Sequence, residues 1–166
     1  GSGWDLKTIE EAGFSPTRLA ALRKLATLES MSDTEMTREL RAAMTDPGAP
    51  SPSVEAILHA IIPFKYVDHT HTDAVVAISN SPQGREILQE IYGDSVLILP
   101  YIMPGFVLAR QVYESTTDID WQTINGIVLL HHGLFTFSDS ARESYNKMIE
   151  LVSQAENHLE SIGAFN

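Results

Sequence analysis

The sequence predicts an α/β fold in one domain spanning residues 1–166. A chain of this length can bury one well-formed core but is short for two. Apolar strand-like runs alternate along it with stretches of helical period, a pattern that predicts a sheet with helices on both faces. No G-x-G-x-x-G follows a predicted strand, and no Gly-Lys-Ser/Thr phosphate loop is present. A nucleotide-binding fold is therefore disfavoured.

The first third of the chain predicts helices and a loop. Ser15 and Pro16 have the residue types of an N-cap and a first helical position, and they predict a helix that runs to about Leu28. Residues 32–35, SDTE, form a capping box that predicts a second short helix. Residues 46–53 are rich in Pro, Gly and Ser, which predicts a loop.

The rest of the chain carries the alternation of strands and helices. The expected elements are a helix from residue 54 that stops near residue 63, a strand over 65–71, a helix over 82–91, a strand over 94–101, a helix over 104–115, a strand over 125–132 and a helix over 138–159. The apolar face predicted for the last helix consists of Tyr145, Met148, Ile149, Val152 and Ala155.

Composition excludes several classes of function. The formal net charge is −11, with 22 acidic against 11 basic residues, so no nucleic-acid partner is expected. There is no cysteine, so any metal must be held by His, Asp or Glu. No apolar run approaches membrane-spanning length and the start lacks a signal-peptide pattern, which predicts a cytoplasmic protein without a membrane partner.

Two histidines at the end of a predicted strand raise the question of metal binding. His69 and His71 are two residues apart, so in a strand both imidazoles point to the same face. That arrangement suits a metal ion and equally suits a pair with no ligand.

A second histidine cluster, His131 and His132, closes the strand predicted over 125–132 and favours the metal hypothesis. Only one of two adjacent side chains can face the metal, and Gly133 permits a sharp turn directly after His132. We therefore expect His132 to be the third ligand and His131 to pack on the other face. Three imidazoles leave an open coordination position, which a catalytic zinc ion requires.

The other candidate residues have ordinary structural explanations. His59 lies among apolar residues of a predicted helix and is expected to be a hydrogen-bonded core histidine, and His158 lies near a helix C-terminus, where a cation is favourable. Glu55 opens the helix that leads into the histidine strand. A glutamate there normally complements the helix dipole, but the short connection to His69 makes it a candidate general base.

Three motifs together resemble the class II aldolase/adducin family. They are PSVE (52–55), HTH (69–71) and HHG (131–133), in that order, and the resemblance extends from about Pro50 to Leu159. The stretches LPYIMPGFVLA and HHGLFTFSDSARESY look most like the aldolase half of bifunctional rhamnulose-1-phosphate aldolase/alcohol dehydrogenases. The resemblance implies a three-layer α/β/α sheet with flanking helices.

The resemblance also implies roles for individual residues. His69, His71 and His132 would hold Zn²⁺ or a similar divalent metal, and Glu55 would be the catalytic acid/base. Ser53 falls where the family contacts the substrate phosphate. Ser2 and Gly3 resemble a Ser-Gly turn of the same phosphate pocket, although Gly-Ser-Gly is also a common cloning remnant.

Two departures from the family pattern bear on the residue roles that the resemblance implies. Val54 stands where the common motif has a second serine, so one hydroxyl contact is absent. The N-terminal elements that usually carry an Asn-containing substrate loop are missing, so the chain is expected to be a fragment of a larger protein.

The implied activity is cleavage of a phosphorylated sugar, rhamnulose 1-phosphate, to dihydroxyacetone phosphate and lactaldehyde. The same ligands also suit a sugar-phosphate epimerase or dehydratase, and an adducin-like module would keep the fold for interaction alone. A fragment with an incomplete pocket would fold without activity. The resemblance further implies a homo-oligomer, a tetramer in the intact protein, with Tyr92 or Tyr101 as candidates for a proton donor to a neighbouring site.

Overall fold

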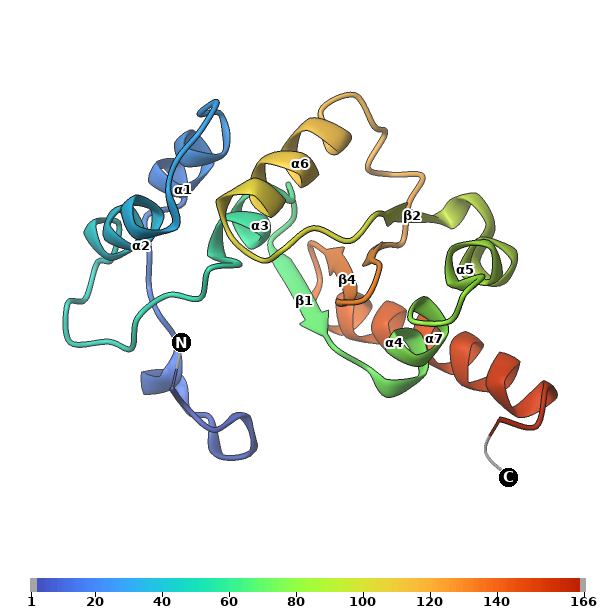
Figure 1. Cartoon of the computed structure of the whole chain (residues 1–166). Helices are drawn as coiled ribbons and strands as arrows, with labels where there is room; N and C mark the ends of the chain where they lie inside the picture. Colours follow the sequence, from blue (N-terminus) through green and yellow to red (C-terminus); the bar gives the residue numbers. More distant parts are fainter. Residues whose placement is uncertain (1–2, 165–166) are drawn as a thin grey trace. The chain divides into compact units, whose positions relative to one another are not determined.

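The chain divides into two compact units in its computed structural model, which describes residues 3–164 apart from the side chain of Leu6 (Figure 1). Unit 1 comprises Gly1–Pro63 and Ile102–Ile119, and unit 2 comprises Phe64–Tyr101 and Asp120–Asn166. The strands of the sheet all belong to unit 2, within the described residues.

Unit 1 is built from helices. Its elements are η1 (Leu6–Thr8), η2 (Glu11–Gly13), α1 (Leu19–Ala26), α2 (Asp33–Ala42), α3 (Ala56–Ile61) and α6 (Phe106–Thr116). The predicted capping box is confirmed: the hydroxyl of Ser32 accepts the N–H of Glu35, and the Glu35 carboxylate accepts the N–H of Ser32 at 3.1 Å. The hydrogen bonds from Ser32 lower the pKa of the Glu35 carboxyl.

The first long helix begins later than the sequence predicts. Ser15 is not its N-cap, because α1 starts at Leu19. The hydroxyl of Ser15 instead donates to the carbonyl oxygen of Pro50 at 2.5 Å. The carbonyl of Pro16 accepts the N–H of Thr45 at 2.9 Å. These long-range hydrogen bonds hold the chain extended where local residue preferences alone indicate a helix.

Unit 2 carries the sheet. Its elements are β1 (Tyr66–Thr70), α4 (Asp73–Ser79), α5 (Gly84–Tyr92), η3 (Gly93–Ser95), β2 (Val96–Leu99), β3 (Gly126–Leu129), β4 (Gly133–Ser138) and α7 (Ala141–Ser161). The strand order is β1-β4-β3-β2, with β4 antiparallel to both neighbours and β2 parallel to β3. This order places β1 beside β4 of the β3–β4 hairpin, although the two strands are far apart in the sequence.

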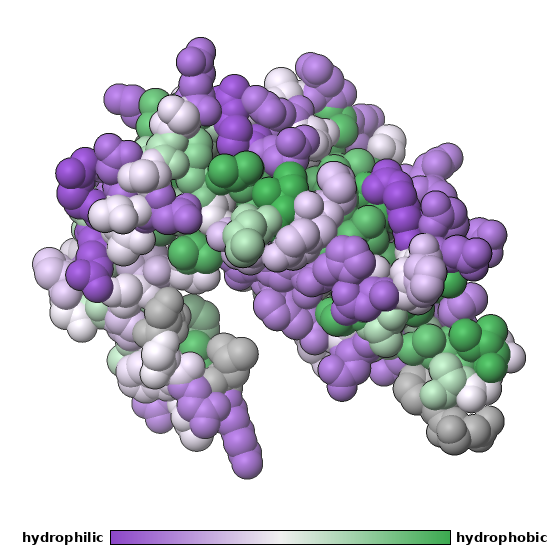
Figure 2. Space-filling view, viewed as in Figure 1, coloured by the Kyte–Doolittle hydropathy of each residue, from purple (hydrophilic) through white to green (hydrophobic). Residues whose placement is uncertain are grey.

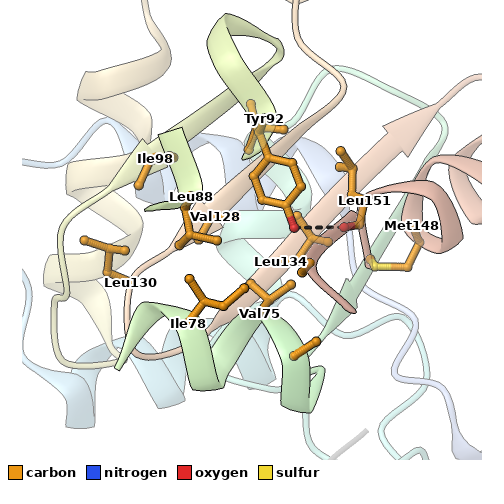
Figure 3. Close-up of a cluster of buried hydrophobic side chains, with 13 residues drawn as sticks. Val75, Ile78, Leu88, Tyr92, Ile98, Val128, Leu130, Leu134, Met148 and Leu151 are labelled. Carbon is orange, nitrogen blue, oxygen red and sulfur yellow. Dashed lines mark hydrogen bonds between the residues drawn. The ribbon is translucent and has the colours of Figure 1, made fainter. Parts of the chain in front are cut away.

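Helices α4, α5 and α7 cover one face of the sheet with a single apolar cluster (Figure 3). Val75 and Ile78 of α4, Leu88 of α5, Val128 of β3 and Leu134 of β4 are all at most 3% exposed. Burying each such side chain contributes about 1.5–3 kcal/mol to folding.

Tyr92 also belongs to this cluster, at the end of α5. Its hydroxyl donates to the carbonyl oxygen of Leu151 at 2.8 Å, as the dashed line in Figure 3 shows. Burial raises the pKa of Tyr92 well above its usual value. The tyrosine is thus a core residue of unit 2 with its hydroxyl satisfied.

Besides the short η3 turn, two elements of unit 2, α4 and β4, are absent from the sequence-based prediction. Helix α4 is seven residues long and contains two adjacent valines, so its helical period is too short to stand out. Strand β4 is buried at every position, so it lacks the alternation that marks a half-exposed strand. Both lie beside the histidine clusters.

Helix α7 is confirmed, but its predicted apolar face is partly wrong. The helix begins at Ala141, and Ser138 is the last residue of β4. Met148 is buried as predicted, whereas Tyr145 and Ile149 are 60% and 47% exposed. Ser144 and Leu151 take the inner positions instead. Ala155 is also buried as predicted, so the burial stripe is rotated by only roughly 65° about the helix axis, because the helix packs on a β4 strand that the prediction lacks.

The predicted class is confirmed as a mixed α/β fold, a four-stranded sheet with flanking helices. In the described part of the chain, no helix combines the length and the hydrophobicity needed to cross a membrane. Hydrophilic side chains predominate on the face drawn in Figure 2, with smaller groups of hydrophobic residues between them.

Candidate metal centre

Three histidines of unit 2 meet where β1 ends beside the β3–β4 hairpin. His69 is the fourth residue of β1, His71 follows the end of that strand, and His132 lies in the turn between β3 and β4. Antiparallel pairing of β1 with β4 sets Thr70 opposite Leu134, two residues after His132. The sheet register therefore brings the two histidine clusters together.

The three imidazole rings surround a common point. Ring centroids lie 4.7 Å apart for His69 and His71, 5.2 Å for His69 and His132, and 4.8 Å for His71 and His132. Each pair of rings is steeply inclined, at 71° to 86°. One nitrogen atom of each ring lies within 4.8 Å of those of the other two. The cluster is able to bind a metal ion.

The surroundings of His69 fix its tautomer. Its Nδ1 lies 3.0 Å from the carbonyl oxygen of Leu134, which can only accept, so Nδ1 carries the hydrogen. Its ring also stacks on Phe135, with centroids 3.9 Å apart. The lone pair on Nε2 is therefore directed at Nε2 of His71, 2.8 Å away. A carbonyl that orients the far nitrogen is a common second contact of metal-binding histidines.

The donor set fits a divalent metal such as zinc. A tetrahedral ion bound at 2.0–2.1 Å by imidazole separates its ligand nitrogens by about 3.3–3.4 Å. The Nε2 atoms of His69 and His71 lie somewhat closer, at 2.8 Å, which is the length of a hydrogen bond donated by His71. A small movement of the exposed His71 ring would exchange that hydrogen for a metal ion.

Gly133 has a role beside these rings that the sequence does not reveal. A Cβ atom on this residue would lie 2.8 Å from Cδ2 of His71 and 2.9 Å from Cε1 of His69, and would also overlap the carbonyl oxygen of Thr70. Gly133 does not have a positive φ, so the site does not need glycine here for its backbone conformation. Glycine is needed here because two imidazoles pack against its Cα atom.

The prediction that His131 packs on the far face of its strand is wrong. Both His131 and His132 lie beyond Leu129, the end of β3, so strand alternation does not separate them. His131 is not packed on the far face of a strand: it is exposed, and its Nδ1 lies 2.6 Å from Oδ1 of Asn80. The turn, rather than the strand, directs only His132 toward the other two histidines.

The remaining predicted site residues belong to unit 1 or lie outside the described residues. Glu55 is half-buried and is the N-cap of α3, and its backbone N–H donates to the hydroxyl of Ser53 at 3.2 Å. Gly3 is exposed and has a φ of 90°. Ser2 lies outside the described residues. The roles of these four residues stay predictions.

The other histidines and the two candidate tyrosines differ in burial. His59 is half-buried in α3, and His158 lies in the last turn of α7. Tyr101 is 48% exposed and contacts the His131 ring edge to face, with centroids 5.9 Å apart. Of the two tyrosines considered as proton donors, Tyr101 alone presents its ring at the surface.

The fold has counterparts among known proteins. The chain is similar over 95% of its length to the N-terminal class II aldolase domain of a conserved protein from Thermoplasma acidophilum, with a TM-score of 0.86 and 41% identity, covering 72% of that structure. An aldolase II superfamily protein from Pseudomonas syringae shares the fold at a TM-score of 0.58 and 16% identity, over 74% of this chain and 52% of that one.

Sequence comparison gives the same assignment. The chain is 35% identical over 159 residues to the uncharacterized oxidoreductase YuxG of Bacillus subtilis, covering 96% of this chain. It spans only 23% of that relative. The model of the class II aldolase and adducin N-terminal domain matches residues 1–159. The chain belongs to the class II aldolase and adducin N-terminal domain family.

Proposed function

We propose that this chain is the aldolase domain of a metal-dependent lyase that cleaves a phosphorylated ketose. The observation that carries the proposal is the convergence of His69, His71 and His132, with the tautomer of His69 set for ligation. Membership of the class II aldolase and adducin N-terminal domain family supports an aldolase reaction. Zn²⁺ is the metal we expect, because three neutral imidazoles suit it and leave a position for substrate.

The histidines and Glu55 would divide the chemistry between them. When bound, the metal supplies Lewis acidity that polarises the substrate carbonyl and stabilises negative charge on its oxygen. Glu55 would accept the proton of the C4 hydroxyl as the C3–C4 bond breaks and the C4–O bond becomes the aldehyde carbonyl. The electron pair of the broken bond passes toward the C2 carbonyl group. Glu55 would deliver a proton to C3 of the dihydroxyacetone phosphate fragment, the general acid/base role that the PSVE motif assigns to it.

The substrate we propose is a ketose 1-phosphate, with rhamnulose 1-phosphate as the first compound to assay. The support is the sequence resemblance of HHGLFTFSDSARESY and LPYIMPGFVLA to rhamnulose-1-phosphate aldolase domains. Ser53, with its exposed side chain, would contact the phosphate, and so would Ser2 and Gly3 if the Ser-Gly turn is retained. The products would be dihydroxyacetone phosphate and lactaldehyde.

A different reaction on the same residues is the main alternative. Epimerisation or dehydration of a sugar phosphate needs the same metal ligands, so product identity must discriminate between them. The relative from Bacillus subtilis is named an oxidoreductase and is about four times as long as this chain. That length is compatible with an aldolase joined to a dehydrogenase in the parent protein. A non-catalytic, adducin-like module is a further alternative, against which the complete histidine set argues.

We also propose that the intact protein is a cytoplasmic homo-oligomer, with a tetramer as the expected state. Its basis is the family resemblance of the motifs. Light scattering of the intact protein tests it, and an active monomer would contradict it.

The decisive assay follows product formation. Zinc-loaded protein, in the form of the full-length parent, is incubated with rhamnulose 1-phosphate, and lactaldehyde and dihydroxyacetone phosphate are quantified by NMR. Equal amounts of both products, absent in a His132→Ala variant, would support the lyase. Isomerised or dehydrated sugar phosphate without cleavage would replace the lyase proposal with the alternative.

A further inference from the structure

His131 has a backbone conformation that residues other than glycine rarely adopt. Its φ is 58°, and it is the one non-glycine residue with positive φ in the described part of the chain. The N–H of His132 donates to the carbonyl oxygen of Leu129 at 3.1 Å, so residues 129–132 form a β-turn with His131 in the third position. A positive φ there is the requirement of a type II turn, which glycine or asparagine usually meets. Such strain persists only where neighbouring groups enforce it.

The enforcing groups come from the C-terminal end of α4. The hydroxyl of Ser79 accepts the backbone N–H of His131 at 3.0 Å. That hydroxyl is itself oriented, because it donates to the carbonyl oxygen of Val76 at 3.1 Å, and Ser79 is only 3% exposed. The next residue, Asn80, accepts the Nδ1 hydrogen of the His131 ring at 2.6 Å. Two adjacent residues thus hold both the backbone and the ring of His131.

The conformation of His131 decides where the next residue points. His132 follows directly, and its ring lies 4.8 Å from that of His71 and 5.2 Å from that of His69, centroid to centroid. If the turn relaxed to a negative φ at His131, the Cα–Cβ direction of His132 would change and its ring would leave the other two. The arrangement of the cluster therefore depends on two residues that hydrogen-bond to His131, next to the cluster.

We propose that Ser79 and Asn80 are positioning residues of the metal centre, which act through the strained turn at His131 to aim His132. This inference rests on the proposed metal site. It assigns a function to the end of α4 and explains why an exposed histidine, which does not join the cluster, stands directly before one that does. Loss of a group that orients a metal ligand typically weakens metal affinity about 10- to 100-fold.

A purely structural explanation is that Ser79 and Asn80 only terminate α4. The backbone N–H of Asn80 does cap the helix, through the carbonyl oxygens of Val76 and Ile78. That capping uses main-chain atoms, whereas the bonds to His131 use both side chains. Substitution of the turn residue itself separates the two explanations, because glycine adopts a positive φ without external support.

The test measures zinc affinity by competition with a chromogenic chelator, together with the visible spectrum of the cobalt-loaded protein, which reports ligand geometry. The variants are Asn80→Ala, His131→Gly and their combination. The control is Asn125→Ala, which makes the same change at an exposed asparagine just before β3. We expect Asn80→Ala to lose about tenfold or more in affinity and to alter the cobalt spectrum. It should cause no further loss in the His131→Gly background.

Different results would contradict either the positioning role or the metal centre itself. If Asn80→Ala behaves like Asn125→Ala, or if its loss persists with glycine at position 131, the positioning role is wrong and the metal site stands. If the wild-type protein binds neither zinc nor cobalt, the proposed metal centre itself fails. A second pair leaves α4 intact in case Asn80→Ala does not fold: His131→Ala should bind about tenfold more weakly than His131→Gly, since alanine resists the positive φ. Equal affinities of that pair would overturn the inference.

Discussion

The Cα atom of Gly133 packs directly against the imidazole ring of His71: a Cβ atom there would lie 2.8 Å from Cδ2 of that ring. The same atom would overlap the carbonyl oxygen of Thr70, which belongs to the backbone of β1 and cannot rotate away. The size of a single residue therefore decides whether the histidine cluster can form, independently of any ligand atom.

Gly133→Ala is expected to lower the free energy of unfolding by about 1–3 kcal/mol, the usual cost of forcing an extra carbon into a packed site. It should also weaken metal binding, because the rings of His69 and His71 must both shift away from position 133. Chemical denaturation and zinc titration measure the two effects. Gly48→Ala is the control: its Cβ would meet only the side chain of Asp46, at 3.3 Å. Equal behaviour of the two variants would contradict the packing argument.

Glu55→Gln should reduce turnover about a hundredfold or more while leaving metal affinity nearly unchanged. The amide keeps the shape of the side chain but removes the basic carboxylate. Steady-state kinetics of the intact enzyme and zinc titration check the two parts, with the exposed Glu29→Gln as a control. Near-normal turnover would contradict a catalytic role and leave Glu55 only its structural role as the N-cap of α3.

Tyr92→Phe removes the hydrogen bond to the carbonyl oxygen of Leu151 and should cost about 0.5–1.5 kcal/mol of stability near pH 7. Burial raises the pKa of Tyr92, so only the unfolded chain releases this proton at about pH 10. The contribution of Tyr92 is thus fully present below that pH and is lost as the pH rises further.

Urea unfolding between pH 7 and 11 tests this dependence. The wild-type protein should lose more stability above about pH 10 than Tyr92→Phe does. Tyr145→Phe, at a 60% exposed position of the same unit, is the control and should change neither quantity. Parallel pH profiles for wild type and Tyr92→Phe would show that the Tyr92 hydroxyl is not buried as described.

The parts of the fold that sequence predicts well are those determined locally. The Ser32 capping box needs only four residues, and β2 and β3 are apolar runs bounded by turn residues. The start of α1 is different, because backbone pairing of Pro16 with Thr45 overrides a favourable N-cap sequence. Long-range hydrogen bonds of this kind leave no local signal.

In the candidate site, too, local sequence predicts some features and long-range contacts determine others. Histidine spacing predicts which residues converge in unit 2, but strand alternation does not explain why His132 joins them and His131 does not. The turn after β3 makes that choice through the φ of His131, held by Ser79 and Asn80 of a helix that the sequence pattern did not reveal. The sequence does carry one signal of this helix. Asn80 follows the TDAVVAIS stretch, and asparagine in that position is typical of a helix C-terminus.

Metal stoichiometry of the purified protein tests the central claim most directly. Wild-type protein is loaded with zinc, dialysed and measured by elemental analysis, alongside His69→Ala, His71→Ala and His132→Ala. His158→Ala, at the far end of α7, serves as the matched control. We predict about one zinc ion per chain for the wild type and for His158→Ala, and a large loss for each of the three cluster variants. Equal zinc content in the wild type and the cluster variants, or none in any of them, would contradict a metal centre at these histidines.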